Sequence, residues 1–222
     1  AIDDWTTITV QSGGVITHTR NTNAKTYFLD FVTTNLNIFG EIEVSERGFQ
    51  PGAGGGTSTG GFGAAHGGEG GLFSVGTPGV VYGSIRNPVD LGSGAGGSGG
   101  GFVRIITTNL NVTGAIRANG GNGCGGGSGG SINITATNFA GFGSVIAAAG
   151  GNGTTGGACA AAQGGAGAGG RVSIVYDNST YPGGIPAINF ETWGGDGNLD
   201  GAGGTIYYFR NGVDTDGHLL VI

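Results

Sequence analysis

Short runs of alternating apolar and polar residues recur along the chain, and each run is followed by a glycine and a second, shorter run. Residues 105–118 (IITTNLNVTGAIRA) show the form. Leu110 and Val112 alternate with asparagine before Gly114, and Ile116 and Ala118 follow that glycine in alternation. Alternation of this kind is typical of strands that bury one face. The pattern therefore predicts two short strands joined at a glycine.

The same unit occurs five times in the chain. Residues 31–44 align without gaps on residues 105–118 and are identical at half of the positions. Weaker copies follow at residues 134–147, 174–187 and 208–221, with the equivalent glycine at positions 40, 114, 143, 183 and 217. One unit alone cannot bury its apolar face, so we expect neighbouring copies to stack.

Stacked units of this length predict an all-β fold, a β-solenoid or β-helix of repeats with almost no helix. Residues 5–18 have the same form of strand, glycine turn and strand, and would be the first repeat. We expect a single repetitive domain that spans residues 1–222. Its strand units lie near residues 5–18, 27–48, 102–118, 131–147, 171–190 and 205–222.

Glycine-rich tracts separate the strand units. Glycine supplies 56 of the 222 residues, and the tracts occupy residues 52–71, 92–101, 120–130, 150–170 and 194–204. Several tracts place glycine at every third position, as at Gly120, Gly123, Gly126 and Gly129. Three residues is the period of the polyproline II conformation. We expect polyglycine II-like insertions on one side of the solenoid, and flexible surface loops are the alternative.

Charge and hydropathy exclude two classes of partner. Lys and Arg total 8 against 14 Asp and Glu, and no basic run occurs, so nucleic-acid binding is not expected. No apolar stretch approaches the roughly 18 residues that would span a membrane. There is no methionine and no basic segment followed by an apolar one, so we expect a processed or excised chain.

Cys124 and Cys159 follow matching GGNG segments in successive glycine tracts. Stacking would bring these tracts together, so we predict an intrachain disulfide, with two free buried thiols as the alternative. A disulfide favours an extracellular or cell-surface location. Acceptor tripeptides for N-glycosylation begin at Asn111, Asn133, Asn152 and Asn178.

Several segments resemble a known family. These are GEIEVSERGF at residues 40–49, GAAHGGEGG at 63–71, YGSIRNPVDLGSG at 82–94 and GGAGAGGRVSIVY at 164–176. Together they resemble glycine-rich repeat modules of very large secreted and surface adhesin-like proteins of bacteria and protists. The resemblance covers nearly the whole chain, and the segment at 82–94 is its most specific part. It implies an extracellular adhesive or structural role without a defined active site.

Two acidic segments are candidates for calcium binding. Asp196, Asn198 and Asp200 alternate near glycine, and Asp214 and Asp216 precede Gly217. Alternating oxygen ligands of this kind occur in calcium loops. Ordinary turn chemistry explains the same residues, and no other cofactor is expected.

The candidates for ligand contact are Trp193, Phe62 and His66, which lie in or beside glycine tracts. Large rings serve as sugar platforms, although they more often form part of a core. The three histidines are isolated in sequence, and Glu41 and Glu43 share one strand face, which is typical of a solvated acidic surface. We therefore expect no enzymatic activity.

Three functional classes follow in order of preference. The first is an extracellular structural subunit of a filament or matrix, in which residues 5–18 of one copy pair with residues 218–222 of the next. The second is an adhesin module that binds a glycan or a surface receptor. The third is an enzyme that acts on polysaccharide, because such enzymes occur on β-helices.

Overall fold

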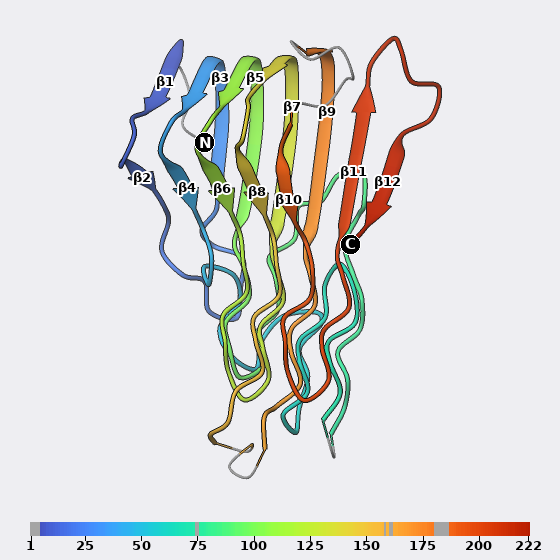
Figure 1. The fold of residues 1–222 in the computed structure, drawn as a ribbon. Helices are drawn as coiled ribbons and strands as arrows, with labels where there is room; N and C mark the ends of the chain where they lie inside the picture. Colours follow the sequence, from blue (N-terminus) through green and yellow to red (C-terminus); the bar gives the residue numbers. More distant parts are fainter. Residues whose placement is uncertain (1–4, 74–75, 158, 160–161, 180–186) are drawn as a thin grey trace.

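The computed structural model describes residues 5–73, 76–157, 159, 162–179 and 187–222, and these contain strands but no helix (Figure 1). One sheet consists, in spatial order, of β1 (Thr7–Val10), β3 (Leu29–Ile38), β5 (Phe102–Val112), β7 (Ser131–Ala140), β9 (Arg171–Ser179), β11 (Thr205–Arg210) and β12 (His218–Val221). The other consists of β2 (Val15–Ile16), β4 (Glu41–Glu43), β6 (Ala115–Arg117), β8 (Val145–Ala147) and β10 (Asn189–Glu191).

Parallel pairing brings the aligned copies together residue for residue. Ile105 of β5 lies between Phe31 of β3 and Ile134 of β7, and Ile174 of β9 continues the row. This spatial register is the same as the register of the sequence alignment. Identical residue types therefore form rows that run across the strands of the larger sheet.

The core lies between the two sheets. Ile105, Ile134 and Ile174 of the larger sheet are fully buried, and they belong to one apolar cluster with Ile42 and Ile116 of the smaller sheet. Complete burial of one such side chain contributes roughly 1.5 to 3 kcal/mol. The β-branched residues of the repeat thus both favour strands and supply the core.

The predicted β-solenoid is wrong. The two sheets are unequal, with seven and five strands, and the larger sheet is mixed, because β12 pairs antiparallel with β11. The reason lies in the last copy, where a turn with Gly212 at a φ of +71° reverses the chain. The backbone N–H of Arg210 donates to the Asp214 carboxylate at 2.7 Å and closes this turn. The last strand therefore returns beside β11 and does not enter the smaller sheet.

The glycine tracts are not insertions on a solenoid but form a body of their own below the sheets (Figure 1). Their backbones pack directly against one another. A Cβ atom built on Gly126 would lie 1.9 Å from the Gly151 carbonyl oxygen, and one on Gly167 would lie 2.0 Å from that of Gly127. Hydrogen bonds join the tracts, for example from Gly151 N–H to Gly127 C=O at 2.8 Å and from Gly167 N–H to Gly151 C=O at 2.8 Å. Backbone groups satisfy one another here, which flexible loops would not achieve.

The segment at residues 82–94 covers the lower half of the outer face of the larger sheet. The Ser173 hydroxyl donates to the Arg86 carbonyl at 2.8 Å, and the Asn133 amide donates to the Asn87 side chain at 2.7 Å. Buried Arg171 donates to the Tyr82 carbonyl at 2.9 Å. Among the described residues, no segment covers the upper half of this face in the same way.

Candidate interaction surfaces

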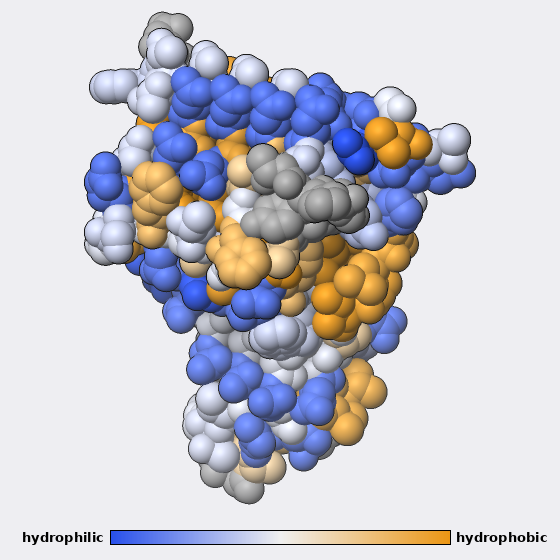
Figure 2. Space-filling view, turned by 45° about the horizontal axis from the view of Figure 1, so that its top comes forward, coloured by the Kyte–Doolittle hydropathy of each residue, from blue (hydrophilic) through white to orange (hydrophobic). Residues whose placement is uncertain are grey.

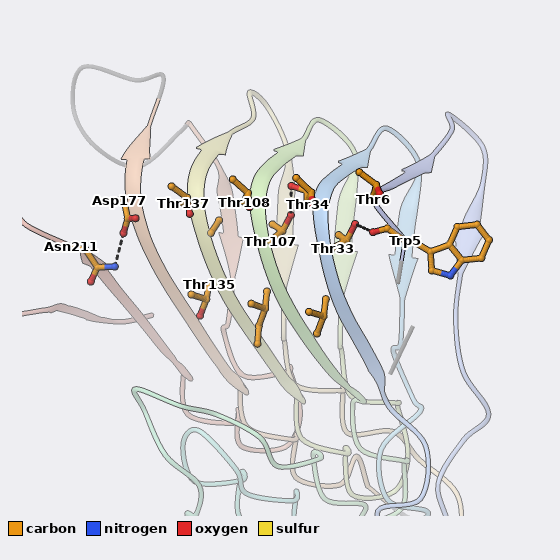
Figure 3. Close-up of a pocket in the computed structure, with 13 residues that line it drawn as sticks. Trp5, Thr6, Thr33, Thr34, Thr107, Thr108, Thr135, Thr137, Asp177 and Asn211 are labelled. Atoms are coloured by element: carbon orange, nitrogen blue, oxygen red, sulfur yellow. Dashed lines mark hydrogen bonds between the residues drawn. The ribbon is translucent and has the colours of Figure 1, made fainter. Parts of the chain in front are cut away.

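A shallow groove of about 640 Å³ crosses the uncovered half of the larger sheet (Figure 3). We call it the threonine groove, and it is lined chiefly by Trp5, Thr34, Ile106, Thr108, Thr137 and Asp177. Among the described residues that line it, Asp177 carries the only charge. The groove is therefore a surface of hydroxyl and apolar groups with a single carboxylate, Asp177, at one end.

A step in the strands produces the groove. In β5, Ile106 is exposed and Thr107 is buried, but Thr108 and Asn109 are both exposed before Leu110 is buried again. Two successive outward residues interrupt the alternation of a regular strand. The same interruption occurs at the same level in β3 and β7. Each of these strands thus presents a threonine and an asparagine side by side.

The asparagines form a continuous row, Asn35, Asn109, Asn138 and Asn178, which we call the asparagine row. Each amide donates to the preceding side-chain oxygen, with distances of 2.8 Å from Asn109 to Asn35, 2.7 Å from Asn138 to Asn109 and 3.3 Å from Asn178 to Asn138. A second shallow groove of about 540 Å³ borders the row. Figure 2 shows the line of hydrophilic residues that crosses the strands here. The row fixes four neutral amides in one orientation.

Both ends of the threonine groove are fixed by hydrogen bonds. At the β1 end, the Thr33 hydroxyl donates to the carbonyl of Trp5, whose own side chain is 61 % exposed. At the other end, the Asn211 amide donates to the Asp177 carboxylate at 2.6 Å (Figure 3). The groove therefore extends across the sheet from the first strand to the turn after β11.

The outer strands of the larger sheet are unpaired on one side among the described residues. β1 pairs only with β3, and β12 pairs only with β11. The carbonyls of Thr6 and Val10 accept hydrogen bonds from the β3 side, so the backbone N–H of Thr9 points away from it. Both edges therefore offer hydrogen-bonding groups to a further strand.

The predicted disulfide between Cys124 and Cys159 is confirmed, and it closes a loop with a sequence separation of 35 residues. Closing such a loop stabilises the folded chain by about 3 kcal/mol, chiefly by restricting the unfolded one. The bond ties two neighbouring glycine tracts together.

The calcium candidates lie in turns. The Asp200 carboxylate accepts the Gly197 N–H at 3.0 Å, and Asp214 accepts the Arg210 N–H and lies 3.6 Å from His218. No group of three or more His, Cys, Asp and Glu side chains that could hold a metal ion occurs among the described residues. Asp196 and Asp216 belong to no such group either, and Asn198 lies between Gly197 and Leu199 in the turn that Asp200 closes. Turn chemistry therefore accounts for the acidic segments that the pattern offered for calcium.

The glycosylation candidates differ in accessibility. Asn133 is buried and donates to Asn87, whereas Asn152 and Asn178 are exposed and Asn111 is half-buried beside the asparagine row. The acceptor residue Thr180 of the Asn178 tripeptide lies outside the described residues, as does the predicted corner glycine Gly183. A glycan on Asn133 is incompatible with the folded chain.

Of the three predicted ligand contacts, the structure places one on the surface. Trp193 is about half exposed, whereas Phe62 is buried and His66 is fully buried. The His66 ring stacks on Tyr82 with 4.6 Å between centroids, and its Nδ1 lies 2.7 Å from the Gly129 carbonyl. Burial lowers the pKa of His66 to about 4, which keeps the imidazole neutral. Phe62 and His66 are therefore interior residues.

The carboxylates considered for catalysis form surface contacts. Glu41 lies 3.6 Å from Arg117, which also lies 3.6 Å from Glu191, and Glu43 accepts the Ser45 N–H at 2.6 Å. These pairs are on the outer side of the smaller sheet and are partly exposed, so each contributes little to stability.

The threonine groove and the asparagine row were not singled out from the sequence. Their signal is the odd spacing of five between Ile105 and Leu110, which are both inward residues. Regular alternation would place residues five positions apart on opposite faces. The odd spacing indicates the step that turns Thr108 and Asn109 outward together.

No protein-family model, curated protein sequence or solved structure matches the chain. Within the part of the chain that the structure describes, no helix is long and apolar enough to cross a membrane.

Proposed function

We propose that the chain is an extracellular structural subunit that assembles end to end into a surface filament or matrix. The observation that carries the proposal concerns the two outer strands, β1 and β12. Among the described residues neither strand has a partner on its outer side, and neither contains Lys, Arg, Asp or Glu. Natural sheets usually protect such edges with lysine, proline or inward charges. Edges without this protection favour pairing with another chain.

The C-terminal edge is also apolar. Leu219, Leu220, Val221 and Ile222 are all exposed, and Leu220 is opposite the buried Ile206, so its side chain extends the inward face of the sheet. The smaller sheet ends at β10 and does not cover that position. Figure 2 shows hydrophobic residues gathered on the side where β12 lies. A partner that covers this edge would bury apolar surface as well as backbone groups.

The opposite end of the molecule offers a complementary recess. An open apolar cavity of about 310 Å³ lies at the β1 end of the core and is lined by Trp5, Ile8, Ile16 and Phe31 with two threonines. When copies share one orientation, β12 of one copy runs antiparallel to β1 of the next. The contact joins two different surfaces, so it need not close on itself and can repeat along a line.

The disulfide supports the extracellular part of the proposal, because such bonds persist in oxidising compartments. Accessible acceptor tripeptides at Asn111 and Asn152 are consistent with secretion. Neither outer strand contains Lys, Arg, Asp or Glu, which favours pairing with another copy of the chain.

Two variants that each damage one edge test the assembly. Leu220→Lys places a charge on the C-terminal edge. Thr9→Pro removes the outward N–H of β1 and leaves the backbone hydrogen bonds between β1 and β3, at the loss of the weak contact between the Asn37 amide and the Thr9 hydroxyl. We expect each variant alone to remain monomeric in light scattering. Their mixture should form dimers, because each supplies the edge that the other lacks. Electron micrographs of the intact protein should show filaments.

Ile106→Lys is the matched control, since Ile106 is 40 % exposed and Leu220 is 46 % exposed, but Ile106 lies on a central strand. It should assemble like the unmodified chain. If Leu220→Lys assembles as readily as this control, the β12 edge is not the joint. Circular dichroism of each variant verifies that the strands are retained.

A further inference from the structure

The upper half of the outer face of the larger sheet presents hydroxyl, amide and apolar groups that take no part in the proposed pairing of the edges. The threonine groove and the asparagine row lie on the face, whereas the proposed joints lie at the edges. We propose that this face binds an extended chain of neutral sugars.

The asparagine row keeps unused hydrogen-bonding capacity. A side-chain amide has two N–H donors and an oxygen with two lone pairs. Contacts within the row use one donor and one lone pair of Asn109 and of Asn138. Each therefore retains a donor and an acceptor for a ligand. Because the row already fixes their orientation, little side-chain entropy is lost on binding.

The neighbouring groove offers hydroxyl and apolar groups in the same repeat. Thr34, Thr108 and Thr137 are exposed and point into the groove (Figure 3). Ile106 is exposed beside them, and Trp5 stands at the end of the groove. Sugar rings combine hydroxyl edges with apolar C–H faces, so they match a surface on which both kinds of group alternate.

The absence of cations on this surface selects the class of sugar. Among the described residues that line the two grooves, Asp177 is the only charged one. An anionic polysaccharide would lose hydration without gaining a charged partner and would be repelled by Asp177. A neutral chain meets no such cost.

The geometry favours a polymer over a single sugar. Adjacent strands lie about 4.8 Å apart, so equivalent groups recur at this interval over four strands. This interval is close to the length of one pyranose ring in an extended chain. If the proposed end-to-end assembly holds, the grooves of successive copies would follow one line, but binding by one copy does not depend on it.

Fluorescence of Trp5 reports on the threonine groove, but Trp5 also lines the recess at the β1 edge, so the measurement uses a chain with a blocked β12 edge. Trp193→Phe leaves Trp5 as the only tryptophan, and Leu220→Lys in the same chain keeps it monomeric, so the result does not depend on assembly. The probes are cellohexaose and mannohexaose, which are neutral, and hexagalacturonate, which is anionic. We expect saturable binding of at least one neutral hexasaccharide, verified by calorimetry, and weaker binding of hexagalacturonate.

The triple variant Thr34→Val, Thr108→Val, Thr137→Val removes the hydroxyls and keeps the side-chain shape. We expect its affinity for the neutral hexasaccharide to fall about tenfold, the effect of losing one or two hydrogen bonds. The control Thr155→Val, in a glycine tract, should bind unchanged. The proposal is overturned if neither neutral sugar binds, if hexagalacturonate binds best, or if the triple variant binds as tightly as the control. It is equally overturned if the triple variant only abolishes side-by-side association of copies, because the face would then bind a second copy.

Discussion

His66 is a neutral histidine enclosed by backbone. Its Nδ1 lies beside the Gly129 carbonyl, and its Nε2 is buried without a hydrogen-bond partner among the described residues. Protonation would place an unpaired charge in that interior close to Arg171, which is itself buried. Burial of the ring disfavours the charged imidazolium, and this lowers the pKa of His66.

We predict that His66 makes the fold sensitive to acid. Its pKa is about 4 in the folded chain and about 6.5 in the unfolded one, so the unfolded chain binds the proton first as pH falls. The neutral state of His66 contributes about 3 kcal/mol to the free energy of unfolding. This contribution is fully present above pH 6.5 and is lost as the pH falls from 6.5 to 4. Denaturant unfolding of the unmodified chain and of His66→Gln at several pH values measures it. Parallel pH profiles of the two proteins would contradict the prediction.

At the level of single residues, the sequence pattern distinguishes the strands from the glycine tracts. Within the tracts it does not show which side chains are exposed and which are buried. Phe62 and His66 lie among glycines, whose composition resembles that of exposed loops, yet both are buried because the tracts pack on one another. The disulfide partners were predictable, because Cys124 and Cys159 follow equivalent GGNG segments. Equivalent positions in a repeat carry spatial information, whereas composition alone carries little.

The glycine tracts are packed structural elements. We therefore predict that adding one methyl group inside them strongly reduces the stability of the folded chain. Gly126→Ala would bring Cβ to 1.9 Å from the Gly151 oxygen and 2.4 Å from the Gly167 nitrogen. Neither backbone atom can move without breaking other tract hydrogen bonds. We expect a loss of about 3 kcal/mol or more, or failure to fold.

Gly55→Ala is the matched control for this substitution. Its Cβ would lie 3.6 Å from the Tyr82 ring, an ordinary contact, and the change should stay within about 0.5 kcal/mol of the unmodified chain. Urea unfolding of both variants measures the difference. Equal stabilities would indicate that the tracts are mobile loops and not packed elements.

For the strands, the repeat in the sequence predicts the register of pairing but not the sheet that each strand joins. The register of β3, β5, β7 and β9 follows from the aligned copies, because apolar residues at equivalent positions bury the same face in each. The position of β12 does not follow, since the last copy has the same length and retains the glycine and the apolar residues after it, but its first strand ends early at Arg210 and a longer turn occupies residues 211–217. Alternation predicts that a segment is a strand, but the connection decides which sheet it joins.

At the scale of the whole molecule, the two layers are stabilised by different means. The sheets bury isoleucine, valine and phenylalanine, whereas the tracts bury peptide groups that bond to one another. The large apolar cluster lies between the two sheets, and the glycine tracts lie below the sheets (Figure 1). The tracts enclose only a few large side chains, among them Phe62 and His66, within closely packed backbone.

This division has a consequence for the heat capacity of unfolding. Exposure of apolar surface raises the heat capacity and exposure of polar surface lowers it, so a chain of 222 ordinary residues would show an increase of about 3 kcal/mol/K. Unfolding of the glycine tracts exposes mainly peptide groups, and scanning calorimetry should therefore give a clearly smaller increase. A heat-capacity increase of about 3 kcal/mol/K would show that the folded tracts bury few peptide groups. With a small increase, the unfolding enthalpy changes little with temperature, and the curve of stability against temperature becomes shallow on both sides of its maximum.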